Sequence, residues 1–344
     1  MSPTPADDDA RQHGVSVIIP VRNEELHLRE AVEAALASDW PGPLEIVLAV
    51  GPSDDQTELI AAALAAEDSR VQVIENPEGG RATGLNLALD AAKYDTIARI
   101  DGHCVIPKDY LSVAMSVLEQ TGASNVGGIM AAEGQSSFEQ AVAAAMVSPL
   151  GVGSAAFHTG GDEGPALTVY LGVFPRAVLD RVGRYDPTFD RAEDWEMNHR
   201  IRSSGGVVWF TPRLRVTYRP RSSVRTLAQQ YFHYGKWRRA IMRRYPETAS
   251  TRYLAPPFAT AVIVAGGAAG VIGTVVGRRI PAAKLLRVGY LAPAGYAAAI
   301  AAGSVVVGRE LPMNVKTQLP AAIATMHLAW GWGFLRSPRG LGRN

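Results

Sequence analysis

One pair of residues has the types and spacing that metal-assisted chemistry needs. In Asp101-Gly-His103, a carboxylate and an imidazole follow an apolar segment and are expected to point at one spot. Carboxylate oxygen and imidazole nitrogen both suit Mn²⁺, and the carboxylate also suits Mg²⁺. Such an ion could bridge two phosphates and neutralise charge that grows on a departing diphosphate. By itself, the pair is equally well explained by a capping aspartate beside a solvent-exposed histidine. The adjacent Cys104 is expected to be a small buried residue rather than a ligand.

A second acidic pair could move a proton. Glu193 and Asp194 open a helix expected at Trp195–Ser203, where negative charge favours the helix N-terminus without any catalytic role. In the functional interpretation, Asp194 is a general base that takes a proton from an acceptor hydroxyl, and Glu193 orients it or the acceptor. Both interpretations stay open on these residues alone.

Strand and helix signals alternate from Val15 to about Tyr218. Alternation of this kind predicts βαβ units and a mostly parallel sheet, with ligands at the carboxyl ends of the strands. Pro20, Val50 and Asp101 fall at such ends, and Ser53-Asp-Asp is expected to cap the second helix. The strands are expected at Val15–Pro20, Leu44–Val50, Val71–Glu75 and Thr96–Ile100, and the helices at Glu24–Leu36, Glu58–Ala66 and Ala82–Ala92.

The C-terminal part is apolar. Phe258–Val276 and Val288–Val307 lack charges and are long enough to span a bilayer, and Leu319–Leu335 is a weaker third run. Core helices of a soluble domain are the less favoured alternative. Because basic residues flank the first run on both sides, we expect it to be a re-entrant hairpin that turns near Gly266-Gly267, with both ends cytosolic.

Overall charge excludes little, but its distribution is informative. Lysine and arginine total 34 against 33 acidic residues, which gives no sign of nucleic acid or another polyanion as a partner. Between Arg213 and Arg252, however, the chain has eleven basic residues and only one acidic residue, Glu247. Within this stretch, the aromatics and cations of Gln229–Arg239 suit a membrane interface or a phosphate, and a purely interfacial helix stays open.

Compartment is suggested by two features. The single cysteine excludes an intrachain disulfide and favours a reducing compartment. The polar segment 1–13, expected to be disordered, lacks the basic and apolar regions of a secretory signal, so the start of the fold is expected in the cytosol.

Five motifs together carry a resemblance to a known family. The motifs occur in the expected order and at sensible spacing. Together they resemble those of family 2 glycosyltransferases with the GT-A fold, in particular a membrane-attached branch that includes succinoglycan-type glucosyltransferases. The resemblance covers nearly the whole chain after Gly14. Its motifs are Val17-Ile-Ile-Pro-Val-Arg-Asn-Glu24, Asn76-Pro-Glu-Gly-Gly-Arg-Ala-Thr-Gly-Leu-Asn86, Asp101-Gly-His103, Glu193-Asp194-Trp and Gln229 through Trp237-Arg238, and the tail Met326–Phe334 is also similar.

The resemblance implies an inverting hexosyltransferase. Asp194, with Glu193, would activate an acceptor hydroxyl, and Asp101 and His103 would hold Mn²⁺ or Mg²⁺. The nucleotide-sugar donor would be bound by Pro20, Arg22, Glu24, Asp55, Arg81 and Asp101. Gln229, Trp237 and Arg238 would match loosely the Q-x-x-R-W-like segment that closes over donor diphosphate and acceptor. One departure is that Val50-Gly51-Pro52-Ser53 stands where the family has paired aspartates followed by Gly-Ser, so uracil, guanine and thymine nucleotides all stay open.

The implied protein is a multi-pass enzyme of the plasma membrane with a cytosolic catalytic domain, a glycan or lipid-linked glycan as acceptor, and contacts to membrane lipids. Its expected parts are a GT-A domain at 14–222, basic amphipathic helices at 223–254, a membrane region at 255–336 and a basic tail at 337–344. The alternatives are a polyprenyl-phosphate sugar synthase and a non-catalytic membrane scaffold. A dinucleotide-dependent oxidoreductase is excluded by the absence of a glycine-rich turn after the first strand, and no Walker lysine follows Gly79-Gly80.

Overall fold

The computed structural model describes residue 11 and residues 13–152, 155–189 and 191–342 of the chain. These residues form two compact units. Unit 1 comprises Met1–Ala131 and Ala155–Tyr218, and unit 2 comprises Ala132–Ser154 and Arg219–Asn344. The chain therefore leaves unit 1 for the last time close to the boundary expected at residue 222, but Ala132–Ser154 groups with unit 2. Apart from Arg11 and His13, the tail that was expected to be disordered lies outside the described residues.

Unit 1 is built on one eight-stranded mixed sheet in the order β3-β2-β1-β4-β7-β5-β8-β6. The four strands that the sequence predicts form its parallel part, and β7 then pairs antiparallel with both β4 and β5. The fold class is thus confirmed, with antiparallel strands added on one side. The strands are β1 (Val15–Val21), β2 (Leu44–Val50), β3 (Val71–Glu75), β4 (Thr96–Arg99), β5 (Asn125–Ala132), β6 (Gly164–Pro165), β7 (Tyr170–Pro175) and β8 (Val208–Tyr218).

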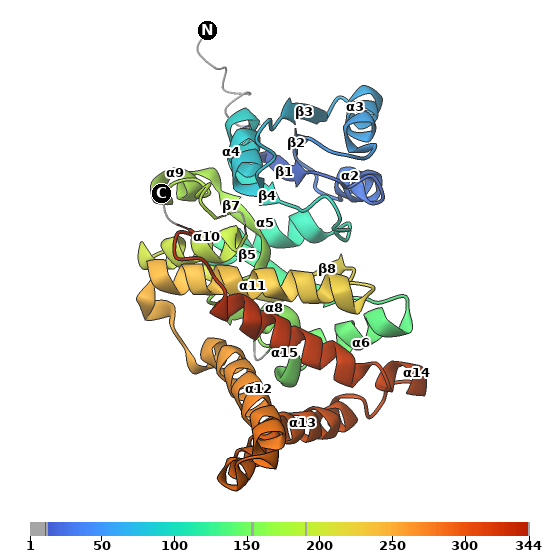
Figure 1. The fold of residues 1–344 in the computed structure, drawn as a ribbon. Coiled ribbons are helices and arrows are strands. Elements are labelled where there is room, and N and C mark those ends of the chain that lie inside the picture. Colours follow the sequence, from blue (N-terminus) through green and yellow to red (C-terminus); the bar gives the residue numbers. More distant parts are fainter. Residues whose placement is uncertain (1–10, 12, 153–154, 190, 343–344) are drawn as a thin grey trace. The chain divides into compact units, whose positions relative to one another are not determined.

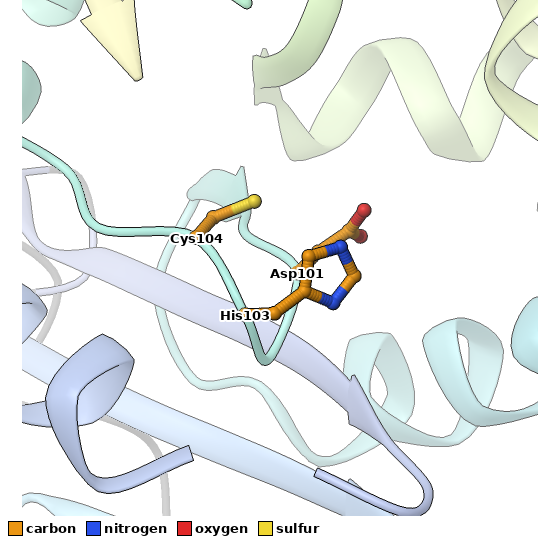
Figure 2. A group of neighbouring side chains, drawn as sticks. All are labelled: Asp101, His103 and Cys104. Atoms are coloured by element: carbon orange, nitrogen blue, oxygen red, sulfur yellow. The ribbon is translucent and has the colours of Figure 1, made fainter. Parts of the chain in front are cut away.

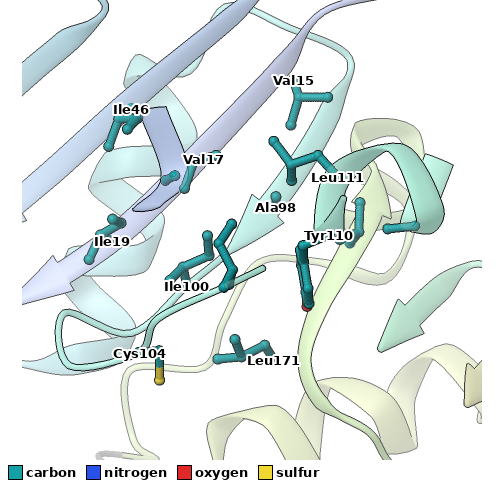
Figure 3. Close-up of a cluster of buried hydrophobic side chains, with 14 of the residues drawn as sticks. Val15, Val17, Ile19, Ile46, Ala98, Ile100, Cys104, Tyr110, Leu111 and Leu171 are labelled. Carbon is teal, nitrogen blue, oxygen red and sulfur yellow. The ribbon is translucent and has the colours of Figure 1, made fainter. Parts of the chain in front are cut away.

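Helices cover both faces of this sheet and bury two apolar clusters. On one face, β1, β2 and β4 pack against α2 (Leu28–Leu36), α3 (Thr57–Glu67) and α5 (Tyr110–Thr121), as Figure 3 shows for the side chains around Ile100 and Tyr110. On the other face lie α4 (Arg81–Ala91), α9 (Arg176–Val182) and α10 (Glu193–Ser203). The short helix α8 (Ala156–Thr159) also belongs to unit 1.

Helix starts are less well predicted than strands. α2 begins at Leu28 rather than Glu24, because turns occupy Glu25–His27. The predicted cap at Ser53-Asp-Asp is wrong: α3 begins after Gln56, whose side chain makes no capping hydrogen bond. Asp55 instead accepts a hydrogen bond from the backbone N–H of Thr57 at 3.0 Å, so it stabilises the same turn from one residue further back.

Unit 2 is helical. Its helices are α6 (Ser137–Met146), α7 (Pro149–Val152), α11 (Val224–Arg244), α12 (Thr251–Val275), α13 (Leu291–Val307), α14 (Met313–Lys316) and α15 (Leu319–Leu335), joined partly by the 3₁₀ segments η1 (Pro246–Thr248), η2 (Val276–Arg278) and η3 (Pro281–Tyr290). α11 and α15 lie side by side (Figure 1). They approach closely because Gly235 of α11 faces the Trp330 carbonyl and Gly333 of α15 faces the Phe232 carbonyl, where an added Cβ would overlap backbone atoms. Arg239 donates hydrogen bonds at 3.0 Å to the carbonyls of Phe334 and Leu335.

Two helical stretches among the described residues are long and apolar enough to cross a membrane, Thr251–Arg278 and Pro281–Val307. The expected third run, Leu319–Leu335, coincides with α15 but is not among them. The predicted re-entrant turn at Gly266-Gly267 is wrong, because α12 continues through both glycines. An added Cβ at Gly266 would collide with the Gly289 carbonyl, so this glycine allows α12 to pack closely against η3 rather than forming a turn.

Candidate active site

The turn after β4 positions the central carboxylate. Along β4, Ala98 and Ile100 belong to one apolar cluster and Ile97 to the other, so the alternation of a strand sends Arg99 to the face that carries α4 and α10. Directly opposite Arg99 on β7 is Gly172, where an added Cβ would overlap Asn125 and the Phe174 ring. Asp101 follows at the carboxyl end of the parallel part of the sheet, where ligands are expected.

Arg99 is the centre of a buried charge cluster. Its side chain is 1% exposed, and its Nη2 atom lies 3.0 Å from Oδ1 of Asp101 and 2.9 Å from Oε1 of Glu193. Its Nη1 atom contacts Oδ1 of Asp194. Arg81, at the start of α4, adds a second guanidinium whose Nη1 lies 3.6 Å from both Oδ2 of Asp101 and Oε1 of Glu193. Two arginines therefore hold the Asp101 carboxylate together with the adjacent carboxylates of Glu193 and Asp194, which lie more than ninety residues later in the sequence.

These charges shift the pKa values of the groups that they surround. Burial alone would raise the pKa of Asp101, but the positive charges of Arg99 and Arg81 outweigh it and hold this pKa well below its usual value. Burial alone would lower the pKa of Arg99, and the carboxylates of Asp101 and Glu193 reverse this and raise it. Asp101 is therefore an ionised carboxylate at neutral pH, which is the form that binds a metal.

The acidic pair lies in the first turn of α10. Ala192 precedes the helix with a left-handed backbone (φ 65°), and Glu193 is already helical, two residues earlier than the sequence suggested. The two side chains differ in access: that of Glu193 is 4% exposed and that of Asp194 is 29% exposed. Asp194 is thus the carboxylate of the pair that a substrate can reach.

Asp101, His103 and Cys104 each offer a ligand atom, and these atoms lie within 4.8 Å of one another. Figure 2 shows all three side chains on the turn after β4, with the His103 ring beside Asp101. Nδ1 of His103 lies 2.8 Å from Oε1 of Glu24, which leaves Nε2 of this ring as its second possible ligand atom. In many metal sites a carboxylate orients a ligating histidine in this way.

Cys104 does not suit the same ion. Burial raises the pKa of its thiol to about 12, and its sulfur lies 2.9 Å from the Tyr170 hydroxyl. Thiolate sulfur is a soft ligand that favours zinc and copper, whereas Mn²⁺ and Mg²⁺ favour oxygen ligands. The donor set that fits is therefore carboxylate oxygen and imidazole nitrogen, which suits Mn²⁺ and, through the oxygen, Mg²⁺.

Hydrogen bonds join the loops at the ends of β1 and β2, beside the turn that follows β4. Pro20 lies near the end of β1, and Nε of Arg22 donates to the Pro52 carbonyl at 3.1 Å. Asp55 accepts a hydrogen bond from the backbone N–H of Glu25 at 3.2 Å, and its hydrogen bond with the Thr57 hydroxyl lowers its pKa. The residues expected to bind a donor (Pro20, Arg22, Glu24, Asp55, Arg81 and Asp101) thus all come from the same end of the parallel strands.

The residues expected to close over donor and acceptor belong to unit 2. On α11, Gln229 is exposed and Trp237 is buried. The guanidinium of Arg238 lies over the Tyr253 ring, 4.0 Å from its centroid, and burial lowers the pKa of this arginine. The neighbouring Gln230 is buried, and its Nε2 donates to the Tyr234 hydroxyl at 2.9 Å.

The comparisons with known proteins agree on one family. The sequence profile of glycosyl transferase family 2 matches residues 16–183. The succinoglycan biosynthesis protein ExoA of Rhizobium meliloti is 31% identical over 324 residues, which cover 93% of each chain. The chain belongs to glycosyl transferase family 2. It is therefore a glycosyltransferase, and the non-catalytic scaffold is set aside.

A more distant relative and a solved structure extend this likeness. A dolichyl N-acetyl-α-D-glucosaminyl phosphate 3-β-D-2,3-diacetamido-2,3-dideoxy-β-D-glucuronosyltransferase of Methanococcus voltae is 22% identical over 240 residues, covering 67% of this chain and 74% of the relative. Among solved structures, the mannosyltransferase PcManGT from Pyrobaculum calidifontis, in complex with GDP-Man and Mn²⁺, has a TM-score of 0.56 and 18% identity, covering 91% of this chain and 86% of that one. This likeness shows that the family 2 chain has the GT-A fold.

Sequence reasoning missed Arg99. The available signal was an arginine inside the mostly apolar segment Thr96-Ile-Ala-Arg-Ile100, two residues before Asp101. A charged side chain in a buried strand needs a partner, and the partners here are the very carboxylates that the motifs single out.

Proposed function

We propose that this family 2 enzyme is a metal-dependent, inverting glycosyltransferase. It transfers a sugar from a nucleotide-diphosphate donor to a hydroxyl of a lipid-linked glycan during synthesis of an exopolysaccharide or another envelope glycan. The observation that carries this proposal is the single cluster in unit 1 that joins Asp101 and His103, a pair suited to a metal, to the more accessible carboxylate of Asp194. The solved relative with Mn²⁺ and GDP-Man supports a metal and a nucleotide sugar.

The donor side is built from loops at the carboxyl ends of the strands. Asp101 and His103 would hold Mn²⁺ or Mg²⁺, which when bound neutralises charge on the leaving diphosphate. Arg81 is 38% exposed beside Asp101, so its guanidinium can also meet a phosphate oxygen. Arg22, Glu24 and Asp55 line the adjoining loops, where they would orient the nucleotide.

The acceptor side is the N-terminal turn of α10. The Asp194 carboxylate accepts the proton of the acceptor hydroxyl as its oxygen attacks the anomeric carbon. One in-line displacement, in which the attacking oxygen forms its bond as the diphosphate leaves on the opposite side, inverts the anomeric centre. Glu193 is too buried to meet the acceptor and fixes this turn through Arg99.

The presence of an accessible carboxylate that can act as a base, Asp194, favours a hydroxyl as the acceptor group. A lipid phosphate is already an anion at neutral pH and needs no proton acceptor, whereas a sugar hydroxyl does. The Methanococcus voltae relative is named for transfer to a dolichyl-phosphate-linked sugar, and the Rhizobium meliloti relative is named for succinoglycan biosynthesis. The first name supports a lipid-linked sugar as the acceptor here, and the second supports an exopolysaccharide as the product.

Unit 2 supports attachment to the membrane on which such an acceptor is carried. The two apolar stretches expose large side chains, among them Phe258, Leu285, Val288, Leu291 and Val305. Lipid tails are the surroundings that such surfaces suit. We place the catalytic unit on the cytosolic side, where nucleotide sugars are made, and assign the plasma membrane as its location.

The test is release of nucleoside diphosphate by the full-length protein in detergent from a panel of UDP-, GDP- and dTDP-sugars. Mn²⁺, Mg²⁺ or EDTA is present, and lipid extract or polyprenyl phosphate is the acceptor. The proposal expects one donor to turn over with lipid extract, to require metal, and to lose activity in Asp101→Ala and Asp194→Asn. NMR of the product should show an inverted anomeric centre. Turnover with polyprenyl phosphate that survives Asp194→Asn would instead identify a polyprenyl-phosphate sugar synthase.

A further inference from the structure

Arg99 is a fully buried cation to which the mechanism above assigns no chemical step. A buried charge is costly to desolvate, and an apolar side chain could complete this part of β4 without that cost. The guanidinium nevertheless contacts carboxylates from two separate elements, the turn after β4 and the first turn of α10. Strand stability therefore does not account for this residue.

The shape of the group suits a bridge. A guanidinium is planar, stays ionised and presents its donors in a fixed fork, so it can hold two carboxylates at a defined separation. One of its terminal nitrogens meets Asp101 and Glu193, and the other meets Asp194. In the proposed function, Asp101 acts on the donor side and Asp194 on the acceptor side.

We propose that Arg99 is a positioning residue for the transfer reaction: it fixes the carboxylates of Asp101 and Asp194 relative to each other, and its positive charge opposes metal binding at Asp101. This inference rests on the proposed function, because it takes from it the roles of the two aspartates. It adds a role for a residue that touches neither donor nor acceptor.

The charges in the cluster give the direction of both effects. Asp101, Glu193 and Asp194 contribute three negative charges, and Arg81 and Arg99 contribute two positive ones. Without Arg99 the cluster becomes more negative and attracts a divalent cation more strongly. At the same time, Asp194 loses the contact that holds it, and a catalytic group misplaced by about 1 Å costs roughly a hundredfold in rate. Tighter metal binding together with slower turnover is a combination that general destabilisation does not produce.

The experiment compares wild type with Arg99→Met and Arg99→Lys, using the full chain in detergent. Mn²⁺ binding is measured by the loss of the electron paramagnetic resonance signal of free Mn²⁺, and turnover is measured in parallel. For Arg99→Met we expect a Kd for Mn²⁺ lower by about tenfold or more and a kcat lower by about a hundredfold. For Arg99→Lys we expect a Kd close to that of wild type, because the charge is kept, and a kcat lower by about tenfold, because the fork is lost.

Arg176 offers the matched control. It is a partly buried arginine of unit 1 whose guanidinium donates to backbone carbonyls, at 3.0 Å to Leu89 and 2.9 Å to Tyr94, rather than to the carboxylate cluster. Arg176→Met should lower Tm and leave the Kd for Mn²⁺ unchanged. This control separates a loss of stability from a change at the cluster.

The outcomes distinguish this inference from the function on which it rests. Suppose that wild type binds Mn²⁺ and that Arg99→Met folds but binds Mn²⁺ equally well or more weakly. This result overturns the role of Arg99 and leaves the proposed function standing. If Arg99→Met does not fold, Arg99→Lys decides: slower turnover with unchanged Kd and donor KM supports the inference, and wild-type kcat overturns it. Wild type that binds no Mn²⁺ overturns both the metal site and the inference.

Discussion

Glu193 and Asp194 are neighbours in sequence, yet the structure predicts opposite consequences for removing their charges. The Glu193 side chain is 4% exposed and its Oε1 atom lies 2.9 Å from Nη2 of buried Arg99. The Asp194 side chain is 29% exposed. Exchanging each carboxylate for its amide keeps the shape and removes the charge, so Glu193→Gln and Asp194→Asn test structural support and proton transfer separately.

The expected magnitudes follow from these environments. Loss of a general base costs roughly 10²- to 10⁴-fold in kcat, which corresponds to about 2.7–5.5 kcal/mol in the activation barrier. Asp194→Asn should show this loss. Because Asp194 also contacts Arg99, the variant's free energy of unfolding should fall too, but by less than that of Glu193→Gln, since the Asp194 side chain is 29% exposed. Glu193→Gln replaces a buried hydrogen bond between charged groups, so it should lower the free energy of unfolding by about 1.5–3 kcal/mol. At roughly 2–4 °C per kcal/mol for a unit of this size, its Tm should fall by about 3–12 °C.

The assay pairs initial rates of nucleoside diphosphate release with thermal unfolding of the same preparations. Glu193→Gln should retain measurable turnover below its Tm, and Asp194→Asn should have a higher Tm than Glu193→Gln and turn over little. The reverse pattern, with an inactive but stable Glu193→Gln and an active Asp194→Asn, would refute the assignment of Asp194 as the general base and make Glu193 the base.

Two further substitutions test packing and ligand choice. Gly235→Ala in α11 should lower the free energy of unfolding by about 1–3 kcal/mol, because the new methyl overlaps the Trp330 carbonyl of α15 and this outweighs the better helix propensity of alanine. Gly267→Ala in α12, where an added Cβ meets nothing within 4 Å, should be neutral or stabilising by up to about 1 kcal/mol; equal Tm changes for the two variants in one detergent would contradict the close helix crossing. Cys104→Ala should keep the Kd for Mn²⁺ within about twofold, because its soft sulfur does not suit this ion and lies against the Tyr170 hydroxyl. A tenfold weaker Kd would make this cysteine a ligand.

The parallel part of the sheet could be predicted because its strands are short, apolar and separated by helical segments. The antiparallel strands could not. β5 begins Asn125-Val-Gly-Gly, where glycines obscure any alternation, and its antiparallel partner β7 follows more than thirty residues later. Pairing over such a distance leaves no local mark in the sequence. The same holds for Ala132–Ser154, whose grouping with unit 2 depends on packing against α14 and α15 rather than on its own composition.

The candidate site divides in the same way. Asp101 and His103 could be singled out because they adjoin a strand end, where the topology of a parallel sheet places ligands. That Glu193 meets the same spot follows from the packing of α10 against the sheet, which no spacing reveals. Arg99 was missed because a residue inside a strand is normally interpreted as core. Its burial and its carboxylate partners become visible only once β4 and α10 are in place.

The path of the apolar helices leads to a last prediction. Thr251–Arg278 is a continuous stretch of 28 residues, and at about 1.5 Å per residue it exceeds the roughly 30 Å of a bilayer core. If its N-terminal end is cytosolic, the segment around Ile280 emerges on the opposite side. The positive-inside tendency opposes this, since Arg278, Arg279 and Lys284 lie there.

We expect the continuity of the helix Thr251–Arg278 to outweigh the positive-inside tendency. A break inside the bilayer would leave backbone groups unsatisfied at several kcal/mol each, whereas loop charges only bias orientation. In a Cys104→Ala background, Ile280→Cys should therefore react with a membrane-impermeant maleimide in intact cells, and Leu341→Cys only after permeabilisation. Ile280→Cys that reacts only in permeabilised cells would mean that the helix pair enters from the cytosolic side without crossing. The charges would then outweigh the length of α12.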